Sequence, residues 1–263
     1  NLLPLDKDEQ ISAMLTVREY SETQYIFMAT AAGTVKKTPL KEFERQRSNG
    51  KIAIDLREGD KLVGVAVTDG EQNILLFSSG GKANCFSEAD VRSMGRTAMG
   101  VRGMRLGEGQ KIICLITSSE GTVLNITENG YGKRTRLAEF TRHKRGGQGM
   151  IAMQTSERNG RLVGAVLVAD HDEIMLITDG GVLVRTRVNE ISVVGRNTQG
   201  VRVIRLDSKE KLIGVDKIDG LVEDESEEDI EQDETIVDEQ PTATDDVASD
   251  PVNQVDPDTG ESE

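Results

Sequence analysis

The chain has 263 residues, with 46 acidic and 32 basic side chains and a formal net charge of −14. Taken whole, this charge argues against a nucleic-acid-binding protein, because such proteins are usually basic. The charge is unevenly distributed, however: residues 221–263 contain 18 acidic side chains and no Lys or Arg, so residues 1–220 carry 28 acidic and 32 basic side chains, a net charge of +4. A mildly basic body with a strongly acidic tail suggests either interaction with nucleic acid or a regulatory tail.

The composition excludes several other classes of protein. Trp is absent and aromatic residues make up 3% of the chain, which argues against single-strand binding by base stacking. No apolar run approaches the length of a membrane span. Residues 1–6 lack the features of a signal peptide, and the missing initial Met suggests a fragment. Cys85 and Cys114 form no CxxC motif, and we expect buried thiols in a cytoplasmic protein.

The sequence repeats with a period close to 50 residues. One marker is a basic residue, two aliphatic residues and a small residue; others are a glycine, a basic residue before Thr, and an acidic residue before an apolar one. All recur in one register, which indicates a repeat architecture. The markers begin at Lys61, Lys111, Arg161 and Lys211; at Gly50, Gly100, Gly149 and Gly200; at Lys37, Arg134 and Arg185, with Cys85-Phe86 at the equivalent position of the second repeat; and at Glu42, Asp90, Glu139 and Glu190.

Within the repeat that spans residues 62–107, apolar runs and turn residues predict four short strands. Asp69-Gly70 and Gly80-Gly81 are hairpin signals between the first three strands. A turn and a polar loop connect the third strand to the fourth. Four strands in about 50 residues are typical of a propeller blade, whereas a two-layer sandwich would not need so strict a period. The predicted strands cover residues 62–67, 73–77, 82–86 and 101–106.

We therefore predict an all-β, propeller-like domain over residues 1–220. The start of the chain matches the end of a repeat, and residues 213–218 begin a fifth unit, so four complete repeats are flanked by partial ones. Residues 221–263 are predicted to be disordered, because so acidic a segment cannot bury enough apolar surface to offset the entropy of ordering. The predicted blades cover roughly residues 11–61, 62–111, 112–161 and 162–211.

The sequence offers little for catalysis. His143 and His171 are the only histidines, and both lie in predicted loops. The GxSxG, HExxH and Walker A motifs and zinc-ligand spacings are absent. Gly80-Gly81 and Gly180-Gly181 are better interpreted as hairpin turns than as phosphate cradles. We expect no catalytic residue, metal site or cofactor in this chain.

The recurrent cations are more informative. Each repeat places Lys or Arg on its third strand and in the loop that follows, so these side chains should occupy equivalent surfaces of successive blades. Such a stripe could bend a DNA duplex, whose phosphates follow a continuous path; the alternative is the solvated face of a repeat. The predicted DNA-binding residues are Lys36, Lys37, Arg45, Arg47, Lys51, Lys82, Arg92, Arg96, Arg102, Lys133, Arg134, Arg136, Arg142, Lys144, Arg145, Arg185, Arg187, Arg196 and Arg202.

One loop of the third repeat combines cations with glycines. Glycines allow backbone N–H groups to approach phosphates while Lys and Arg supply charge. The stretch Lys144-Arg145-Gly146-Gly147-Gln148-Gly149 resembles a degenerate copy of the Gln-Arg-Arg-Gly-Gly-Lys-Gly box of the gyrase A family. His143 stands in place of the first Gln and Gln148 in place of the Lys, and the family's own box lies upstream, so we expect one contact among several here.

Other segments are also similar to the gyrase A C-terminal domain family, among them the opening Asn1-Leu2-Leu3-Pro4-Leu5 and Val17-Arg18-Glu19-Tyr20. The resemblance implies a six-bladed β-pinwheel with strand exchange between blades. It implies a basic rim that wraps duplex DNA independently of sequence, and ATP-dependent negative supercoiling by an A2B2 heterotetramer with gyrase B. ATP, Mg and the catalytic Tyr belong to other parts of that enzyme. The isolated domain is expected to be monomeric, cytoplasmic and associated with the nucleoid.

Two alternatives stay open for the function. One is the equivalent domain of topoisomerase IV, and the other is a protein-binding propeller scaffold. The acidic tail is expected to compete with DNA as a tethered phosphate mimic and so to modulate wrapping; the alternative is a spacer that promotes solubility.

Overall fold

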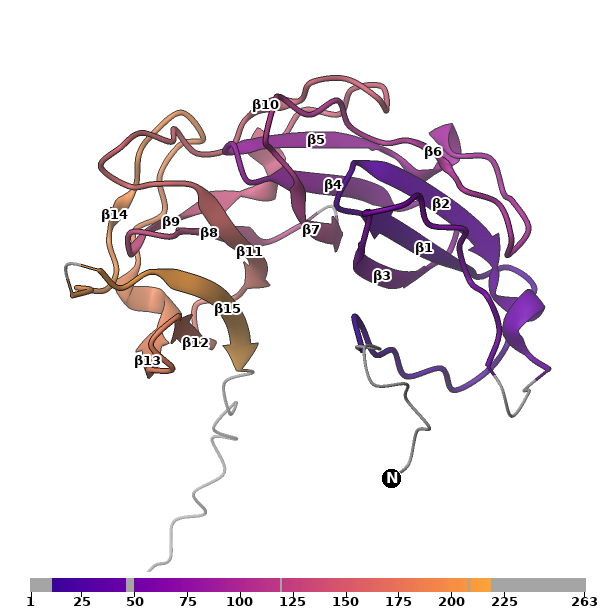
Figure 1. Cartoon of the computed structure of the whole chain (residues 1–263), viewed down its shortest axis with the longest axis horizontal. Helices are drawn as coiled ribbons and strands as arrows, with labels where there is room; N and C mark the ends of the chain where they lie inside the picture. The colour runs from indigo at the N-terminus through magenta and orange to yellow at the C-terminus, as the bar shows by residue number, and fades with distance from the viewer. Residues whose placement is uncertain (1–10, 46–49, 119, 208, 219–263) are drawn as a thin grey trace, which may run out of the picture. The chain divides into compact units, whose positions relative to one another are not determined.

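The computed structural model describes residues 11–45, 50–118, 120–207 and 209–218 (Figure 1). These ranges consist of β-strands, short 3₁₀ helices and connecting loops, which confirms the all-β prediction. Within them, no helix is long and apolar enough to cross a membrane. The start of the chain and the predicted acidic tail, residues 221–263, lie outside the described residues.

Four antiparallel sheets follow one another along the chain, three with four strands and the last with three described strands. Their orders are β3-β1-β2-β6, β7-β4-β5-β10, β11-β8-β9-β14 and β15-β12-β13. The strands, sheet by sheet, are β1 (Tyr25–Thr30), β2 (Thr34–Pro39), β3 (Leu62–Thr68) and β6 (Val101–Arg102); β4 (Asn73–Ser78), β5 (Lys82–Ser87), β7 (Ile112–Thr117) and β10 (Met150–Ile151); β8 (Thr122–Thr127), β9 (Tyr131–Arg136), β11 (Leu162–Val168) and β14 (Val201–Arg202); and β12 (Glu173–Thr178), β13 (Leu183–Arg187) and β15 (Leu212–Ile218).

The predicted turns within a sheet are confirmed. β4 and β5 pair with Phe77 opposite Ala83, and Gly81 between them has a φ of 75°. A 3₁₀ helix follows the second strand of each sheet, where the sequence indicates a connecting turn. These helices are η1 (Leu40–Phe43), η2 (Glu88–Asp90), η3 (Leu137–Glu139) and η4 (Val188–Glu190).

The predicted hairpin at Asp69-Gly70 is wrong. β3 pairs with β1, whereas β4 pairs with β5 and β7, so this turn connects two sheets. The predicted blade boundaries at residues 62, 112 and 162 are shifted for the same reason, because each falls at a strand that closes the preceding sheet. Residues 213–218 likewise belong to β15 of the fourth sheet and do not begin a fifth. The apolar pattern of a strand is the same whichever neighbouring strand it pairs with, so the pattern does not indicate the partner.

The outer edge of each four-stranded sheet is completed by the following repeat. β6, β10 and β14 lie after the central strands of one sheet but pair with β2, β5 and β9 of the sheet before it. The structure therefore contains the strand exchange that the resemblance implies. Gly33 O also accepts the N–H groups of Gly103 and Met104, at 2.8 and 3.2 Å. Backbone hydrogen bonds of this kind hold consecutive blades together.

The glycine marker is explained by this exchange. Gly200 directly precedes β14 and has a φ of 76°, and a Cβ atom there would lie 2.6 Å from the carbonyl oxygen of Gly132. Gly100, before β6, makes the same close approach to Val35. Glycine is required here both by the backbone conformation and by the nearness of another strand.

Apolar cores fill the spaces between neighbouring sheets. On β4, Ile74 and Leu76 face the first sheet, whereas Leu75 and Phe77 face the third, so residues 74–77 are apolar on both faces of the strand. The innermost strands β3, β7, β11 and β15 contact one another in series (Figure 1). A Cβ atom on Gly64 of β3 would lie 2.7 Å from Cβ of Leu115 on β7. The small residue of the first marker therefore lets adjacent inner strands approach.

Replacing Gly200 with Ala should destabilise the domain more than replacing Gly50. Both glycines have positive φ, 76° and 69°, but a Cβ on Gly50 meets nothing within 4 Å. Gly50→Ala should cost about 1–2 kcal/mol for the left-handed backbone, and Gly200→Ala about 1–3 kcal/mol more for the clash with β9. Urea unfolding of both variants measures the difference, and equal losses would contradict this account of the marker.

Candidate nucleic-acid interface

Four of the predicted DNA-binding cations are buried. Lys36 and Lys133 have no exposed surface, and Lys37 and Arg134 are 7% and 6% exposed. They lie on β2 and β9, second strands whose two faces are both covered. The prediction that these four side chains lie on an exposed stripe is wrong, because each reaches inward to the following blade.

Lys36 and Lys133 each bind the loop of the next blade to the strand on which the lysine lies, and Lys36 also binds Ala53 of its own repeat. Lys36 Nζ donates to the carbonyl oxygens of Ala53, at 2.7 Å, and Arg96. Lys133 Nζ donates to those of Gly195 and Arg196, at 2.6 and 2.5 Å. Each bond gives a backbone carbonyl group a charged donor, and charge-assisted hydrogen bonds of this kind are stronger than neutral ones.

Asn84 takes the place of this lysine in the second sheet. Its side-chain amide donates to the carbonyl oxygens of Gly103, at 3.0 Å, and Lys144, at 3.5 Å. The amide thus fastens the loop of the third blade as the lysines fasten those of the second and fourth. The contact needs a hydrogen-bond donor and not a charge.

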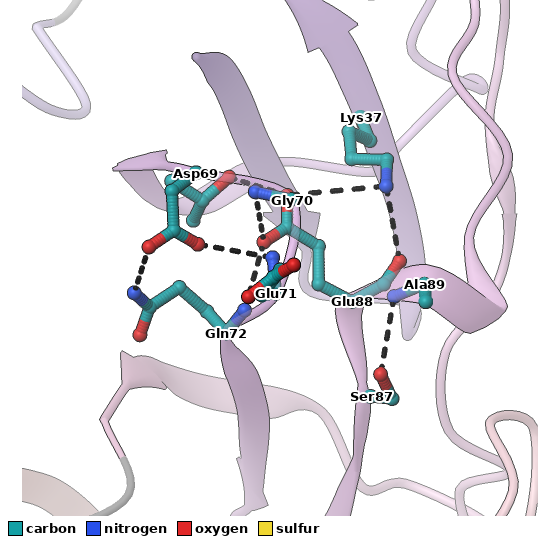
Figure 2. Close-up of polar contacts among 9 residues, drawn as sticks. Lys37, Asp69, Gly70, Glu71, Gln72, Ser87, Glu88 and Ala89 are labelled. Carbon is teal, nitrogen blue, oxygen red and sulfur yellow. Dashed lines mark hydrogen bonds and ion pairs between the residues drawn. The ribbon is translucent and has the colours of Figure 1, made fainter. Parts of the chain in front are cut away.

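Lys37 joins the first blade to a buried carboxylate of the second (Figure 2). Its Nζ donates to the Glu88 carbonyl oxygen at 3.2 Å and lies 4.0 Å from Glu88 Oε1. The Glu88 side chain has no exposed surface and accepts bonds from the Thr68 hydroxyl, at 2.5 Å, and from the N–H groups of Gly70 and Gln72, at 3.1 and 3.3 Å. The Glu88 carboxylate therefore stabilises the segment that connects β3 of the first sheet to β4 of the second.

Arg134 makes the corresponding contact from the third blade to the fourth. Its Nε donates to the Ile191 carbonyl oxygen at 2.6 Å, and its guanidinium forms an ion pair with Asp170 in the link to β12. The first basic pair, Lys36 and Lys37, and the second, Lys133 and Arg134, thus have the same structural role.

Burial lowers the pKa of Lys133 to about 8, because the charged ammonium loses hydration; Glu139 opposes this shift. Burial also lowers the pKa of Lys36, where Glu42 opposes the shift. Carbonyl dipoles compensate for only part of the lost hydration of an ammonium group.

The remaining predicted cations are exposed or half-buried, apart from Arg47, which lies outside the described residues. They occupy the outer two strands of the sheets, the ends of those strands and the loops that follow, away from the innermost strands. Arg96 and Arg196 also donate to the carbonyl oxygens of Ile52 and Ile151, at 3.0 and 2.7 Å. The exposed residues are Arg45, Arg92, Arg102, Arg136, Arg142, Lys144, Arg145, Arg185, Arg187 and Arg202; the half-buried ones are Lys51, Lys82, Arg96 and Arg196.

The box-like loop is anchored to the second blade. Gly146 N–H donates to the Gly103 carbonyl oxygen at 2.6 Å, and Gly147 O accepts the N–H of Arg105 at 2.8 Å. Arg145 donates from Nε to the Asp90 carbonyl oxygen, at 2.9 Å, and from Nη1 to that of Arg102, at 3.1 Å. The Gly146 N–H group is therefore occupied by the protein instead of facing a ligand, while the Lys144 and Arg145 side chains remain exposed.

The two cysteines do not belong to the exposed cation surface. Cys85 and Cys114 are both free; Cys85 is buried as predicted and Cys114 is half-buried. Burial raises the pKa of Cys114 to about 12, and its Sγ donates to the Ala165 carbonyl oxygen at 2.8 Å. Across the described ranges, no three His, Cys, Asp or Glu side chains are grouped so as to hold a metal ion.

Arg158 is a surface cation that the repeat comparison missed. It contacts Tyr131, as does the predicted residue Arg202. The first marker aligns Arg158 with Glu58 and Glu108 of the two preceding repeats. The available signal was the change from an acidic to a basic residue at this position of the repeat. A comparison that looks for residues common to all repeats does not detect such a change.

The Lys133 environment predicts a pH-dependent stability. Between pH 8 and its ordinary pKa of 10.5, Lys133 is more protonated in the unfolded chain than in the folded one, so the free energy of unfolding should rise with pH. At about 1.4 kcal/mol per pH unit, the gain is about 3 kcal/mol. Urea unfolding at pH 7–10.5 should show this rise in the parent chain but not in Lys133→Met, with Lys144→Met as the exposed control. Parallel curves for the parent chain and Lys133→Met would contradict the assignment.

Comparison with known proteins identifies the family. Residues 24–69, 72–119, 122–169 and 172–219 each match the model of the DNA gyrase C-terminal domain, beta-propeller. Each matched segment contains two central strands and the innermost strand of one sheet.

The chain is 54% identical over 226 residues to the A subunit of DNA gyrase from Salmonella typhimurium, and 51% identical over 256 residues to that from Klebsiella oxytoca. These alignments cover 86% and 95% of this chain but only 26% and 29% of the relatives. The chain thus spans about a quarter of the length of the curated relatives that it matches.

Two solved structures share the fold. The crystal structure of the C-terminal domain of DNA topoisomerase IV superposes with a TM-score of 0.77 at 31% identity, covering 83% of this chain and 69% of that one. The structure of the DNA gyrase A C-terminal domain gives 0.72 at 28% identity, covering 82% and 73%. With four family matches that coincide with four sheets, the chain belongs to the DNA gyrase C-terminal domain family of β-propellers.

Proposed function

We propose that this domain binds duplex DNA along its exposed outer-strand and loop cations and bends the duplex into a chiral wrap. The observation that carries the proposal is the recurrence of exposed cations at equivalent places on successive blades, as with Arg102 on β6 and Arg202 on β14. The strand exchange fixes each of these positions relative to the preceding sheet. Repeated phosphate contacts along a curved surface offset the cost of bending DNA.

Binding of this kind is independent of base sequence. Phosphate contacts position a duplex without reading it, and sequence enters through the ease with which the duplex bends. The buried cations Lys36, Lys37, Lys133 and Arg134 act indirectly, by holding the blades and loops that carry the DNA contacts.

The similarity to gyrase A relatives extends the proposal to the larger protein. We place the domain in a type IIA topoisomerase, an A2B2 complex with gyrase B, where its wrap supports ATP-dependent negative supercoiling in the cytoplasm. In this proposal the propeller has six blades in the intact protein. ATP, Mg and the catalytic tyrosine belong to other parts of the enzyme, and the isolated domain is monomeric.

The structural similarity to topoisomerase IV favours a second candidate. The TM-scores, 0.77 for topoisomerase IV and 0.72 for gyrase A, do not separate the two enzymes by fold. Gyrase is preferred because curated gyrase A sequences are more than 50% identical to this chain over most of its length. A protein-binding scaffold has no comparable support.

Removing one outer cation should weaken DNA binding and lower its dependence on salt. For Arg142→Gln and for Arg187→Gln, the slope of log K against log salt should become shallower by about 1, because about one phosphate contact is lost. Lys61→Gln is a matched control, since Lys61 is exposed but precedes the innermost strand β3. Fluorescence anisotropy with a labelled duplex measures the slopes. An equal change in the control, or a slope near zero in the parent chain, would refute the proposal.

Topoisomer analysis should reveal chiral wrapping and the role of the acidic segment. Nicked plasmid ligated in the presence of residues 1–263 should show a shift in linking number. Residues 1–220, which lack 18 acidic side chains, should give a larger shift, since a tethered acidic segment competes with phosphates. Equal shifts would make this segment a spacer, and salt-sensitive binding with no shift would mean that these blades bind DNA but do not wrap it.

A further inference from the structure

We propose that Tyr131, Arg158 and Arg202 form a preorganised site for one phosphate oxyanion at the outer edge of the third sheet. The inference rests on the proposed function to the extent that the oxyanion is a phosphodiester of the DNA backbone. The geometry of the site is independent of that function.

The two guanidinium groups converge on one phenolic oxygen. Tyr131 begins β9 and is 5% exposed, and Arg202 is its cross-strand partner on the exchanged strand β14. Arg202 Nη2 donates to the Tyr131 oxygen at 2.8 Å, and Arg158 Nε donates to it at 3.4 Å. The guanidinium carbons lie 5.3 and 4.9 Å from the centre of the ring, within the range of a cation–π contact.

Such an arrangement concentrates positive charge. Two like charges that share one acceptor repel each other, and in the part of the chain that the structure describes neither arginine forms an ion pair with a carboxylate. The hydrogen bonds from Arg202 and Arg158 lower the pKa of Tyr131, because they favour the phenolate. A bound anion would relieve the repulsion between the guanidinium groups.

The donors that remain free suit a phosphate. The Tyr131 oxygen accepts both guanidinium bonds, and the described residues offer no acceptor for its own proton. Each arginine has five N–H groups and uses one on the phenol. Hydroxyl and guanidinium donors thus surround a cavity of about 280 Å³, which Lys211 also lines. Donors from several directions can serve several oxygens of one tetrahedral anion.

Two acidic residues line the same cavity without neutralising the arginines. Asp207 and Glu210 belong to the turn before β15, where Glu210 Oε2 accepts the Asp207 N–H at 3.4 Å. The Lys211 ammonium donates to Asn129 Oδ1. With three cations and two carboxylates around the cavity, the local charge is weakly positive and suits one anionic group.

The site is particular to the third sheet. Arg202 corresponds to Arg102, but Tyr131 occupies the position of Thr34 and Lys82 in the preceding sheets, and Arg158 that of a glutamate. Arg102 therefore presents a single cation opposite Thr34, without a phenol or a second arginine. It provides a matched control within the same chain.

A purely structural role would give a different result on mutation. If the cluster serves only to hold β14 on β9, its loss should lower the melting temperature and leave DNA binding by the folded protein unchanged. If it binds an oxyanion, its loss should weaken binding at temperatures where every variant remains folded.

The test uses the full chain, a labelled duplex, and Tyr131→Phe, Arg158→Gln, Arg202→Gln and the control Arg102→Gln. We expect Kd at low salt to rise about tenfold or more for Arg158→Gln and Arg202→Gln, because each removes a charge-assisted bond to an oriented anion. Tyr131→Phe keeps the ring and removes only the hydroxyl, and should raise Kd several-fold. Arg102→Gln should have the smaller effect of a single unoriented cation. The inference is overturned if Arg158→Gln and Tyr131→Phe bind DNA as the parent chain does and inorganic phosphate also fails to stabilise the parent chain.

A second arm distinguishes the source of the oxyanion. Inorganic phosphate is added to the parent chain and to Tyr131→Phe, and the melting temperature of each is measured at constant ionic strength. Stabilisation of the parent chain alone, with DNA binding equal in both, would support the oxyanion site and assign it to free phosphate. Weakened DNA binding without phosphate stabilisation would assign it to the DNA backbone. If the parent chain shows neither salt-sensitive DNA binding nor stabilisation by phosphate, the site itself is refuted. If the parent chain is stabilised by phosphate but does not bind DNA, only the proposed function is refuted.

Discussion

The exchanged outer strand is the interaction on which the rest of the structure depends. A three-stranded blade would leave the outer edges of β2, β5 and β9 unpaired, with exposed N–H and C=O groups that invite association. The following repeat covers these edges with β6, β10 and β14. The chain must then cross closely over the strand that it caps, which requires glycine at positions such as Gly100 and Gly200. Blade order and the position of each following loop are fixed by the same backbone bonds.

Once the loop of one blade lies over the strand of another, its carbonyl groups need donors. Lys36 and Lys133 supply ammonium donors, and Asn84 supplies an amide in the same place. The lowered pKa of Lys133 shows the cost of burying the charge, which the amide avoids. Lysine makes the shorter contacts, 2.6 and 2.5 Å from Lys133 Nζ, whereas the Asn84 amide lies 3.0 and 3.5 Å from its two carbonyl oxygens.

The period in the sequence was sufficient to predict the three longer strands of each repeat and the turns between paired strands, whereas the strand predicted over residues 101–106 is limited to Val101–Arg102. The period was insufficient to predict pairing, because Leu62–Thr68 is apolar on both faces whether it opens one sheet or closes the one before. The site shows the same limit. A basic residue can recur because each blade binds the same ligand or because each blade makes the same contact inside the protein. Lys36 recurs for the second reason. Flanking residues distinguish the two: Lys36 lies between buried Val35 and buried Lys37, whereas Arg187 ends a strand exposed to solvent.

The net charge of only +4 on residues 1–220 is compatible with the proposed DNA binding, because carboxylates and the predicted DNA-binding cations lie in different places. Some carboxylates accept backbone hydrogen bonds next to the start of an innermost strand. Asp60 Oδ1 accepts the N–H groups of Ala32 and Lys61, at 2.9 and 2.8 Å, and Glu128 Oε1, from the turn between β8 and β9, accepts that of Arg161 at 2.9 Å. The exposed cations that are predicted to contact DNA lie instead on outer strands and loops. A phosphate interacts mainly with charges within a Debye length, about 8 Å at physiological salt. The charge that matters for binding is therefore that of the outer edge, and the net charge of the whole chain is a poor guide to it.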